Sequence, residues 1–291
     1  MLRKELIKAV KHLELVARRA VNDQLAGQYQ SVFKGRGMDF TDVREYQPGD
    51  DIRVIDWNVS ARTGQMHIKQ FVEERELTVL LLVDASASQT FGTVNRSKQQ
   101  TSAEIAALIA FSAIKNNDRV GLFIFTDEME IFLPPKKGRK HVLRVITEIL
   151  DFKPKSRGTD LASALKYMAR ITRKRALVFA ISDFQDENFE MSLNIANRRH
   201  EVIPVLVEDP MEFELPDMGL APFQDPETGE VFVADTSSPK VRQAYRKAAL
   251  RRHNKLLQLF RKNKIDHIPI RTDKSHIEPL VQYFRTRSKR H

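Results

Sequence analysis

Short apolar segments alternate with amphipathic segments from about residue 77 onward, and this alternation constrains the fold more than any other feature. The apolar segments are rich in β-branched residues; they are Leu77–Val83, Val120–Phe125, Ala176–Ile181, Val202–Val207 and Ile265–Ile270. Helical periodicity separates them, in Ser97–Lys115, Arg139–Leu150, Leu161–Ile171, Asn188–Arg199, Val241–Lys262 and Ile277–Phe284. Largely apolar strands that alternate with helices predict an α/β fold with a doubly wound, mostly parallel sheet and helices on both faces. Glu130–Leu133 is expected to add a short edge strand.

Two parts of the chain depart from this alternation. We expect residues 1–76 to form a separate N-terminal segment, and residues 77–291 to form the α/β domain. Residues 208–238 interrupt the domain with four prolines and a Thr228-Gly229 turn, which predicts an irregular insertion that ends in a small hairpin.

The N-terminal segment begins with a predicted amphipathic helix. Its apolar residues recur at helical spacing; they are Leu2, Leu6, Val10, Leu13 and Ala17. The favoured interpretation is a helix packed on its own domain, because charged helix faces are usually solvated. Contact with a partner or with an anionic membrane surface is the alternative.

Composition excludes several classes of site. The chain of 291 residues contains no cysteine, which rules out disulfides, a cysteine nucleophile, cysteine-bound zinc and iron–sulfur clusters. Lys and Arg interrupt every apolar stretch near the N-terminus, so no signal peptide and no transmembrane helix are expected. We therefore expect a cytoplasmic protein.

Oxygen-bearing side chains follow two of the predicted strands and precede one of the predicted helices. Asp84, Ser86 and Ser88 come directly after the first strand, Thr159 and Asp160 precede a helix, and Asp183 follows the strand Ala176–Ile181. In doubly wound sheets ligands bind outside the carboxyl ends of the strands, so these loops are expected to converge. Carboxylate and hydroxyl oxygens suit Mg²⁺ or Mn²⁺, and few carboxylates would leave the ion open to a further ligand.

This constellation resembles the metal-ion-dependent adhesion site of von Willebrand factor A domains. The resemblance implies one ion with hydroxyl ligands from Ser86, Ser88 and Thr159, and with Asp84 and Asp183 acting directly or through water. It further implies a vacant position that accepts an acidic side chain from a client protein. Asp160 is a candidate for supporting these ligands. Where many A domains have Gly after the last aspartate, this chain has Phe184.

A second resemblance covers nearly the whole chain. The sequence is similar to the domain-of-unknown-function-58 family in these segments: Gly35–Phe40, Arg44–Asp51, Arg53, Ile55–Trp57, Ser60–Thr63, Asp209-Pro210 and Glu214–Pro216. The resemblance implies an adaptor or co-chaperone that works with a MoxR-type AAA+ ATPase in protein maturation or assembly.

The charged signature segment can also be interpreted physically. Arg44, Arg53 and Arg62 lie among acidic residues, and arginine forms bidentate pairs with carboxylates. We expect an ion-pair network that pins the N-terminal segment to the sheet, with a partner-docking surface as the alternative. Trp57, the only tryptophan, is expected to pack in the core or at an interface.

The sequence therefore predicts a non-enzymatic, metal-dependent protein-binding module. No P-loop, no zinc-protease motif and no nucleophile elbow is present. A net charge of +10 keeps a nucleic-acid or anionic-surface binder as an alternative, although no specific nucleic-acid signature accompanies the basic clusters. A magnesium-dependent hydrolase ranks last, because no general base stands in a readable motif beside the site.

Overall fold

The computed structural model describes residues 3–21, 25, 29, 39–72, 76–90, 92, 96–224 and 229–288. The helices are α1 (Arg3–Ala20), α3 (Trp57–Thr63), α4 (Lys98–Lys115), α5 (Arg139–Asp151), α6 (Leu161–Ile171), α7 (Glu190–Arg199), α8 (Pro239–Lys262) and α9 (Ile277–Ser288). The short 3-10 helices are η2 (Ile52–Val54), η3 (Ala87–Thr90) and η4 (Pro210–Glu212). The strands are β1 (Asp39–Glu45), β2 (His67–Val72), β3 (Thr78–Asp84), β4 (Arg119–Phe125), β5 (Met129–Lys136), β6 (Leu177–Ser182), β7 (Glu201–Glu208), β8 (Leu220–Gln224), β9 (Val231–Asp235) and β10 (Ile268–Arg271).

The central sheet has six strands in the order β10-β7-β6-β3-β4-β5. All pair in parallel except β5, which runs antiparallel along the edge, as predicted, but is longer than expected. From β3 the chain builds outward first through β4 and later, in the other direction, through β6. The order therefore reverses between β3 and β6, which is where such sheets bind ligands. The predicted doubly wound α/β fold is confirmed.

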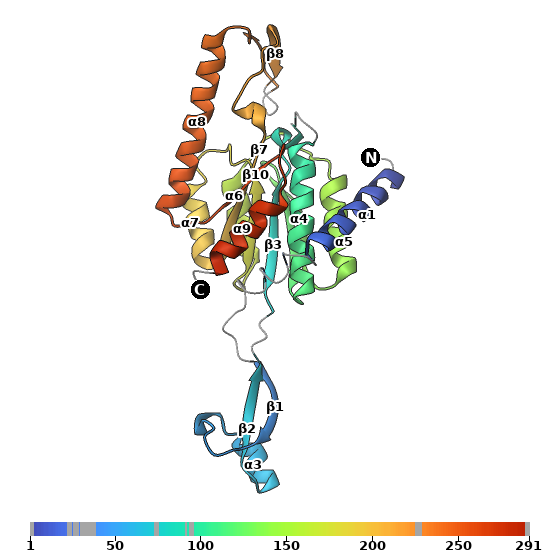
Figure 1. Cartoon of the computed structure of the whole chain (residues 1–291), viewed down its shortest axis with the longest axis vertical. Coiled ribbons are helices and arrows are strands. Elements are labelled where there is room, and N and C mark those ends of the chain that lie inside the picture. Colours follow the sequence, from blue (N-terminus) through green and yellow to red (C-terminus); the bar gives the residue numbers. More distant parts are fainter. Residues whose placement is uncertain are drawn as a thin grey trace.

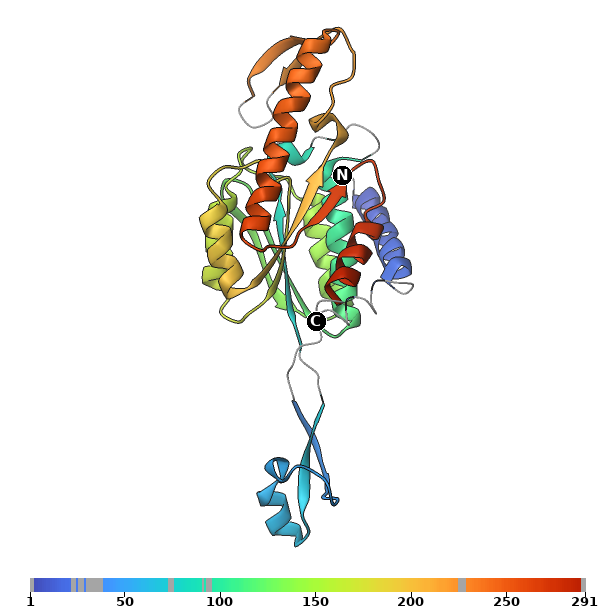
Figure 2. The same ribbon diagram turned by 60° about the vertical axis from the view of Figure 1, so that its left-hand side comes forward.

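Each face of the sheet has its own hydrophobic core, because alternate residues of a strand point to opposite faces. On β3, Val79, Leu81 and Val83 belong to the core shared with α1, α4, α5 and α9, whereas Leu80 and Leu82 belong to the core shared with α6, α7 and α8. Figures 1 and 2 show the two groups of helices on opposite sides of the sheet. Burial on both faces explains why the strands are apolar throughout.

The first helix packs on its own domain, as favoured from its periodicity. Leu13 and Ala17 of α1 are buried in the core that α4 and α5 also line. Leu2 and the side chain of Leu6, which belong to the same predicted stripe, lie outside the described residues, as do Gly35–Met38 of the signature and Thr228 of the predicted turn. Within the described residues, no helix combines the length and the hydropathy needed to cross a membrane.

The signature segment forms a small module of its own, made of β1, η2, α3 and β2. It projects from the end of the sheet where the parallel strands begin (Figures 1 and 2). Arg44 makes a bidentate pair with Asp50, at 2.7 and 2.8 Å, and Asp51 and Asp56 cap η2 and α3. Gly49, with φ 109°, supplies the turn that brings Asp50 back to Gln47.

This module corrects two expectations. The Arg44–Asp50 pair lies inside the module, and the Asp51 and Asp56 caps do too, so these charges do not pin the segment to the sheet. They fold the segment on itself because each acidic group meets a donor only a few residues away. Of the two alternatives for Trp57, packing in the core is wrong, because its side chain is 67% exposed at the start of α3.

The insertion is an arm that rises above the other end of the sheet. After β7, η4 leads to the antiparallel pair β8 and β9, and α8 returns to the sheet (Figure 2). The predicted hairpin is confirmed in β8 and β9. Phe260, near the end of α8, is buried in the core below, whereas Phe232 on β9 is exposed.

Candidate metal-binding site

The Asp-x-Ser-x-Ser segment forms a tight turn at the carboxyl end of β3. Asp84 is almost fully buried, and its Oδ1 accepts a hydrogen bond from the backbone N–H of Ser86 at 2.9 Å. The hydroxyl oxygens of Ser86 and Ser88 lie 3.0 Å apart. The turn thus gathers one carboxylate and two hydroxyls, as the spacing predicts.

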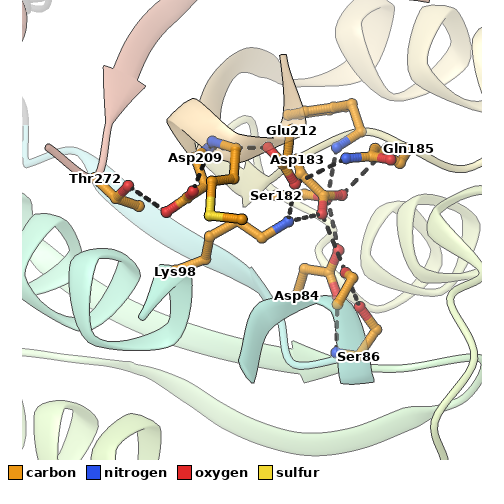
Figure 3. A network of polar contacts seen from close by, with 12 residues as sticks. Asp84, Ser86, Lys98, Ser182, Asp183, Gln185, Asp209, Glu212 and Thr272 are labelled. Carbon is orange, nitrogen blue, oxygen red and sulfur yellow. Dashed lines mark hydrogen bonds and ion pairs between the residues drawn. The ribbon is translucent and has the colours of Figure 1, made fainter. Parts of the chain in front are cut away.

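The neighbouring strand β6 completes this arrangement from across the switch point. Ser182, its last residue, donates from Oγ to Asp84 Oδ2 at 2.6 Å. Asp183 follows directly, and its Oδ2 accepts from Ser88 Oγ at 3.1 Å. Four of the predicted site residues, Asp84, Ser86, Ser88 and Asp183, are therefore joined in one polar network (Figure 3).

Thr159, the fifth predicted ligand, reaches this edge on a separate loop. The backbone N–H of Ala87 donates to the carbonyl of Arg157 at 3.0 Å, which fixes that loop beside the serine turn. Asp160 does not support the ligands: its side chain caps α6 by accepting from the N–H of Ser163 at 2.7 Å. A helix N-cap uses the carboxylate locally, which removes it from the site.

A lysine that the sequence interpretation missed lies at the centre of the site. Lys98, the first residue of α4, is 1% exposed, and its Nζ lies 2.5 Å from Asp183 Oδ2 and 2.6 Å from Glu212 Oε1 (Figure 3). The two carboxylates raise the pKa of Lys98 against the opposing effect of its burial. The ammonium is therefore a permanent positive charge in the network.

Glu212, at the end of η4, connects the site to the arm. Besides Lys98, it accepts from Gln185 Nε2 at 2.9 Å and from the backbone N–H of Asp209 at 2.9 Å. Asp209 is itself fully buried and accepts from Thr272 Oγ1 at 2.7 Å. The signature pair Asp209-Pro210 thus starts η4 and aims Glu212 at Lys98.

Charge in this network is not balanced. The network contains three carboxylates, Asp84, Asp183 and Glu212, and one ammonium, which pairs with the last two; two negative charges are unmatched when all are ionised. Burial, reinforced by the charge of Asp183, raises the pKa of Asp84, and burial likewise raises the pKa of Glu212. A divalent cation beside Asp84 would supply the missing charge.

The donor set fits a hard cation. In the described part of the chain, no group of three or more Asp, Glu or His side chains could hold a metal ion, so hydroxyl oxygens would have to complete the shell. Ser86, Ser88 and Asp84 offer oxygens of the kind that Mg²⁺ prefers. Gln89, on the same turn, has a buried amide without a hydrogen-bond partner among the described residues, which is a further sign of unmet polar capacity at this edge.

The family of the chain follows from its sequence. The family described as "Protein of unknown function DUF58" matches residues 42–255, which span the charged module, the site and most of the arm. This chain belongs to the DUF58 family.

The relatives of this DUF58 protein match either nearly its whole length or a part of it. An uncharacterized protein of Mycobacterium tuberculosis, Rv1480, is 33% identical over 291 residues, which cover 98% of this chain and 90% of that protein. The uncharacterized protein YeaD of Bacillus subtilis is 33% identical over 107 residues, 37% of this chain and 25% of that protein.

Two solved structures are similar to this DUF58 chain in fold. The conserved hypothetical protein BatB from Bacteroides thetaiotaomicron is 17% identical with a TM-score of 0.46, and the match covers 73% of this chain and 99% of that one. The SpRpn10 VWA domain is 12% identical with a TM-score of 0.39, and the match covers 72% of this chain and 95% of that one. Both likenesses concern the fold alone.

The sequence around Lys98 and Glu212 contains indications of their roles that the sequence analysis did not use. A lysine at the first position of a helix opposes the helix dipole, which indicates a specific acidic partner. Asp209-Pro210 followed by Glu212 is a capping box with proline at the first helical position. Neither feature predicts that Lys98 and Glu212 form an ion pair, because 114 positions separate them in the sequence.

Phe184, which follows Asp183, has a left-handed backbone. Its φ is 53°, which costs a non-glycine residue roughly 1–2 kcal/mol. Its N–H donates to Ser182 Oγ at 3.0 Å, and its ring packs edge-on against Phe260 of α8. The strained backbone therefore holds Ser182 and Asp183 in place while the ring anchors α8.

We expect Lys98→Met to destabilise the fold by about 3–5 kcal/mol, because it leaves two buried carboxylates unpaired. Urea unfolding checks this, with Lys140→Met, a change at an exposed lysine of α5, expected to stay within about 0.5 kcal/mol of the wild type. Adding Glu212→Gln to Lys98→Met is expected to recover part of the loss. A loss under about 1 kcal/mol for Lys98→Met contradicts the central role of the ammonium.

The backbone at Phe184 predicts an unusual order of stabilities. Both Phe184→Gly and Phe184→Ala lose the buried ring, but only glycine relieves the positive φ, so the glycine variant is expected to be the more stable by about 1 kcal/mol. Phe179 is the control: it is fully buried within β6, and its φ is not positive. There alanine should be the more stable variant by about 0.5–1 kcal/mol, and the same order at both positions would contradict the assigned strain.

Proposed function

We propose that this protein is a non-enzymatic binding module that recognises an acidic side chain of a client protein through one divalent cation, Mg²⁺ or Mn²⁺. Ser86, Ser88 and Thr159 would contribute hydroxyl oxygens, and Asp84 and Asp183 would act directly or through water. The observation that carries the proposal is the joined network of Asp84, Ser86, Ser88 and Asp183 at the switch point of the sheet.

The charge of the network supports a divalent rather than a monovalent ion. Lys98 leaves two negative charges unmatched, which one Mg²⁺ would balance. Because Lys98 already occupies Asp183 Oδ2, the part of the site left for an ion is the side formed by Asp84 and the two serines. An ion held there by few charged ligands would remain attractive to an incoming carboxylate.

The residues around the proposed cation site have different roles. Ser182 orients Asp84 by donating to it, and Lys98 holds Asp183 beside Ser88. Glu212 and Gln185 fix η4 at the rim of the site. The bound cation would supply an electrophilic contact for the carboxylate of the client, and no bond is made or broken.

The family resemblance supports one further part of the proposal, a partnership with a MoxR-type AAA+ ATPase. An adaptor of this kind needs a second surface besides the client site. The projecting module offers one at the other end of the sheet, where Trp57 and Ile52 are exposed. Exposed tryptophan is the side chain most often found at the energetic centre of protein interfaces.

The cation proposal predicts saturable uptake of Mn²⁺ by the wild type in isothermal titration and in electron paramagnetic resonance. Asp84→Asn should abolish it, because the substitution keeps the shape but removes the charge that faces the serines. Ser88→Ala should weaken it by about tenfold or more, on the scale seen when groups around a metal are removed.

The control for this titration is Asp118→Asn. Asp118 is another largely buried carboxylate, and burial raises its pKa, but it lies just before β4, at the opposite end of the strands. The Asp118→Asn variant should therefore bind Mn²⁺ with the affinity of the wild type. Equal titrations for the wild type and Asp84→Asn, with both folded by circular dichroism, would remove the cation from the proposal.

The ATPase partnership predicts binding to a purified MoxR-type ATPase that depends on the module rather than on the cation. Trp57→Ala should weaken this binding by at least about tenfold, as at interface centres, while its exposure leaves the unfolding free energy within about 0.5 kcal/mol of the wild type. Surface plasmon resonance in Mg²⁺ and in EDTA tests both points. Unchanged affinity for Trp57→Ala would contradict the assignment of this surface.

A further inference from the structure

A large groove opens beside the candidate site, between α7 and the lower part of α8. It has a volume of about 1060 Å³, and Asp183, Gln185 and Glu212 of the site line one end. Lys262 and Asn263, at the end of α8, bind Glu190 of α7 at 3.0 and 3.2 Å. The groove is thus walled by two helices that are joined through Glu190, and its lining includes residues of the polar network.

The lining contains apolar side chains, two of which are largely exposed. On α7, Met191 and Ile195 are 74% and 52% exposed and lie four residues apart, on one helix face. On α8, Leu256 and Leu259 are half-buried and face the same space. Methionine suits surfaces that accept varied partners, because its unbranched side chain adapts its shape.

Among the lining groups that form no ion pair within the described residues, basic side chains outnumber acidic ones, which are Asp186 and Glu187. Lys166, Arg198, Arg252 and Lys255 are exposed, and none makes an ion pair or a side-chain hydrogen bond within the described residues. Several acidic residues of the lining are, by contrast, already engaged: Glu190 with Lys262, Glu208 with His253 at 2.6 Å, and Glu212 with Lys98. An occupant with apolar and acidic side chains would therefore match both the lining and the free charges.

We propose that this groove binds an amphipathic, acidic helix of the client protein. Two helical walls around an apolar floor form the kind of groove that accepts a helix through apolar side chains at i, i+3, i+4 and i+7. The inference rests on the proposed function in one respect: the same client would present its cation-binding carboxylate where the groove meets Asp183. The contacts along α7 and α8 do not themselves require the cation.

The test uses a fluorescein-labelled helical peptide of about 14 residues, roughly 21 Å long, with Leu on one face and Glu elsewhere. Fluorescence anisotropy should show saturable binding to the full chain in EDTA, weaker binding at high salt, and no binding of matched peptides with Lys for Glu or Ser for Leu. Arg252→Glu with Lys255→Glu should lower affinity by about tenfold or more. Met191→Asp with Ile195→Asp should lower affinity by a similar factor. Because both side chains are exposed, this variant should remain folded.

The matched control reverses the charge of two other α8 residues, as Lys247→Glu with Arg251→Glu. Both side chains are exposed on α8 but do not line the groove. The affinity of this control variant for the peptide should fall by less than about twofold. No saturable binding of the Leu/Glu peptide, or equal losses in the groove and control variants, overturns the inference. Mg²⁺ separates the two proposals: if Mg²⁺ changes nothing but the groove variants lose affinity, the groove stands and the cation site fails.

Discussion

One buried ammonium connects the parts of the chain on which the candidate site depends. Lys98 begins α4, Asp183 follows β6, and Glu212 ends η4, so a single charge ties a helix, the sheet and the arm together. Burying a charge costs several kcal/mol unless partners surround it, and both carboxylates are within 2.6 Å. The geometry of the serine turn is therefore set partly by residues that would not touch a bound ion.

Several energetically costly features lie together at this edge of the sheet. Phe184 has a left-handed backbone, Asp84 is buried beside another carboxylate, and the buried Gln89 amide has no hydrogen-bond partner among the described residues. Single features of this kind also occur elsewhere, such as the buried His200 ring, which has no hydrogen-bond partner among the described residues, and Lys264, whose φ is 53°. At this edge three of them lie within one turn of a buried carboxylate network. Strain and unmatched polar groups persist where a function requires them, which supports placing the function here.

The sequence was sufficient for the fold because apolar runs and helical periodicity are local signals. It also brought Asp84, Ser86, Ser88 and Asp183 together, since strand ends in a doubly wound sheet share one edge. It could not pair Lys98 with Glu212, because that contact depends on how the arm returns over the sheet. It could not decide between a core and an interface position for Trp57, because hydrophobicity alone does not separate a core side chain from an exposed one.

The two ends of the molecule are stabilised by different kinds of contact, short-range in the module and long-range at the site. This difference affects how an adaptor would work. The module at the amino ends of the strands is held by short-range pairs such as Arg44–Asp50, so it keeps its shape without contributing to the sheet. The site at the carboxyl ends is held by contacts between distant segments, and Glu212 extends it to the arm. A client engaged at the site and groove would therefore act on Lys98, Glu212 and α8 together, while a partner on the module would leave them undisturbed. Under the proposed function, this separation lets one chain hold two proteins at once without either contact blocking the other.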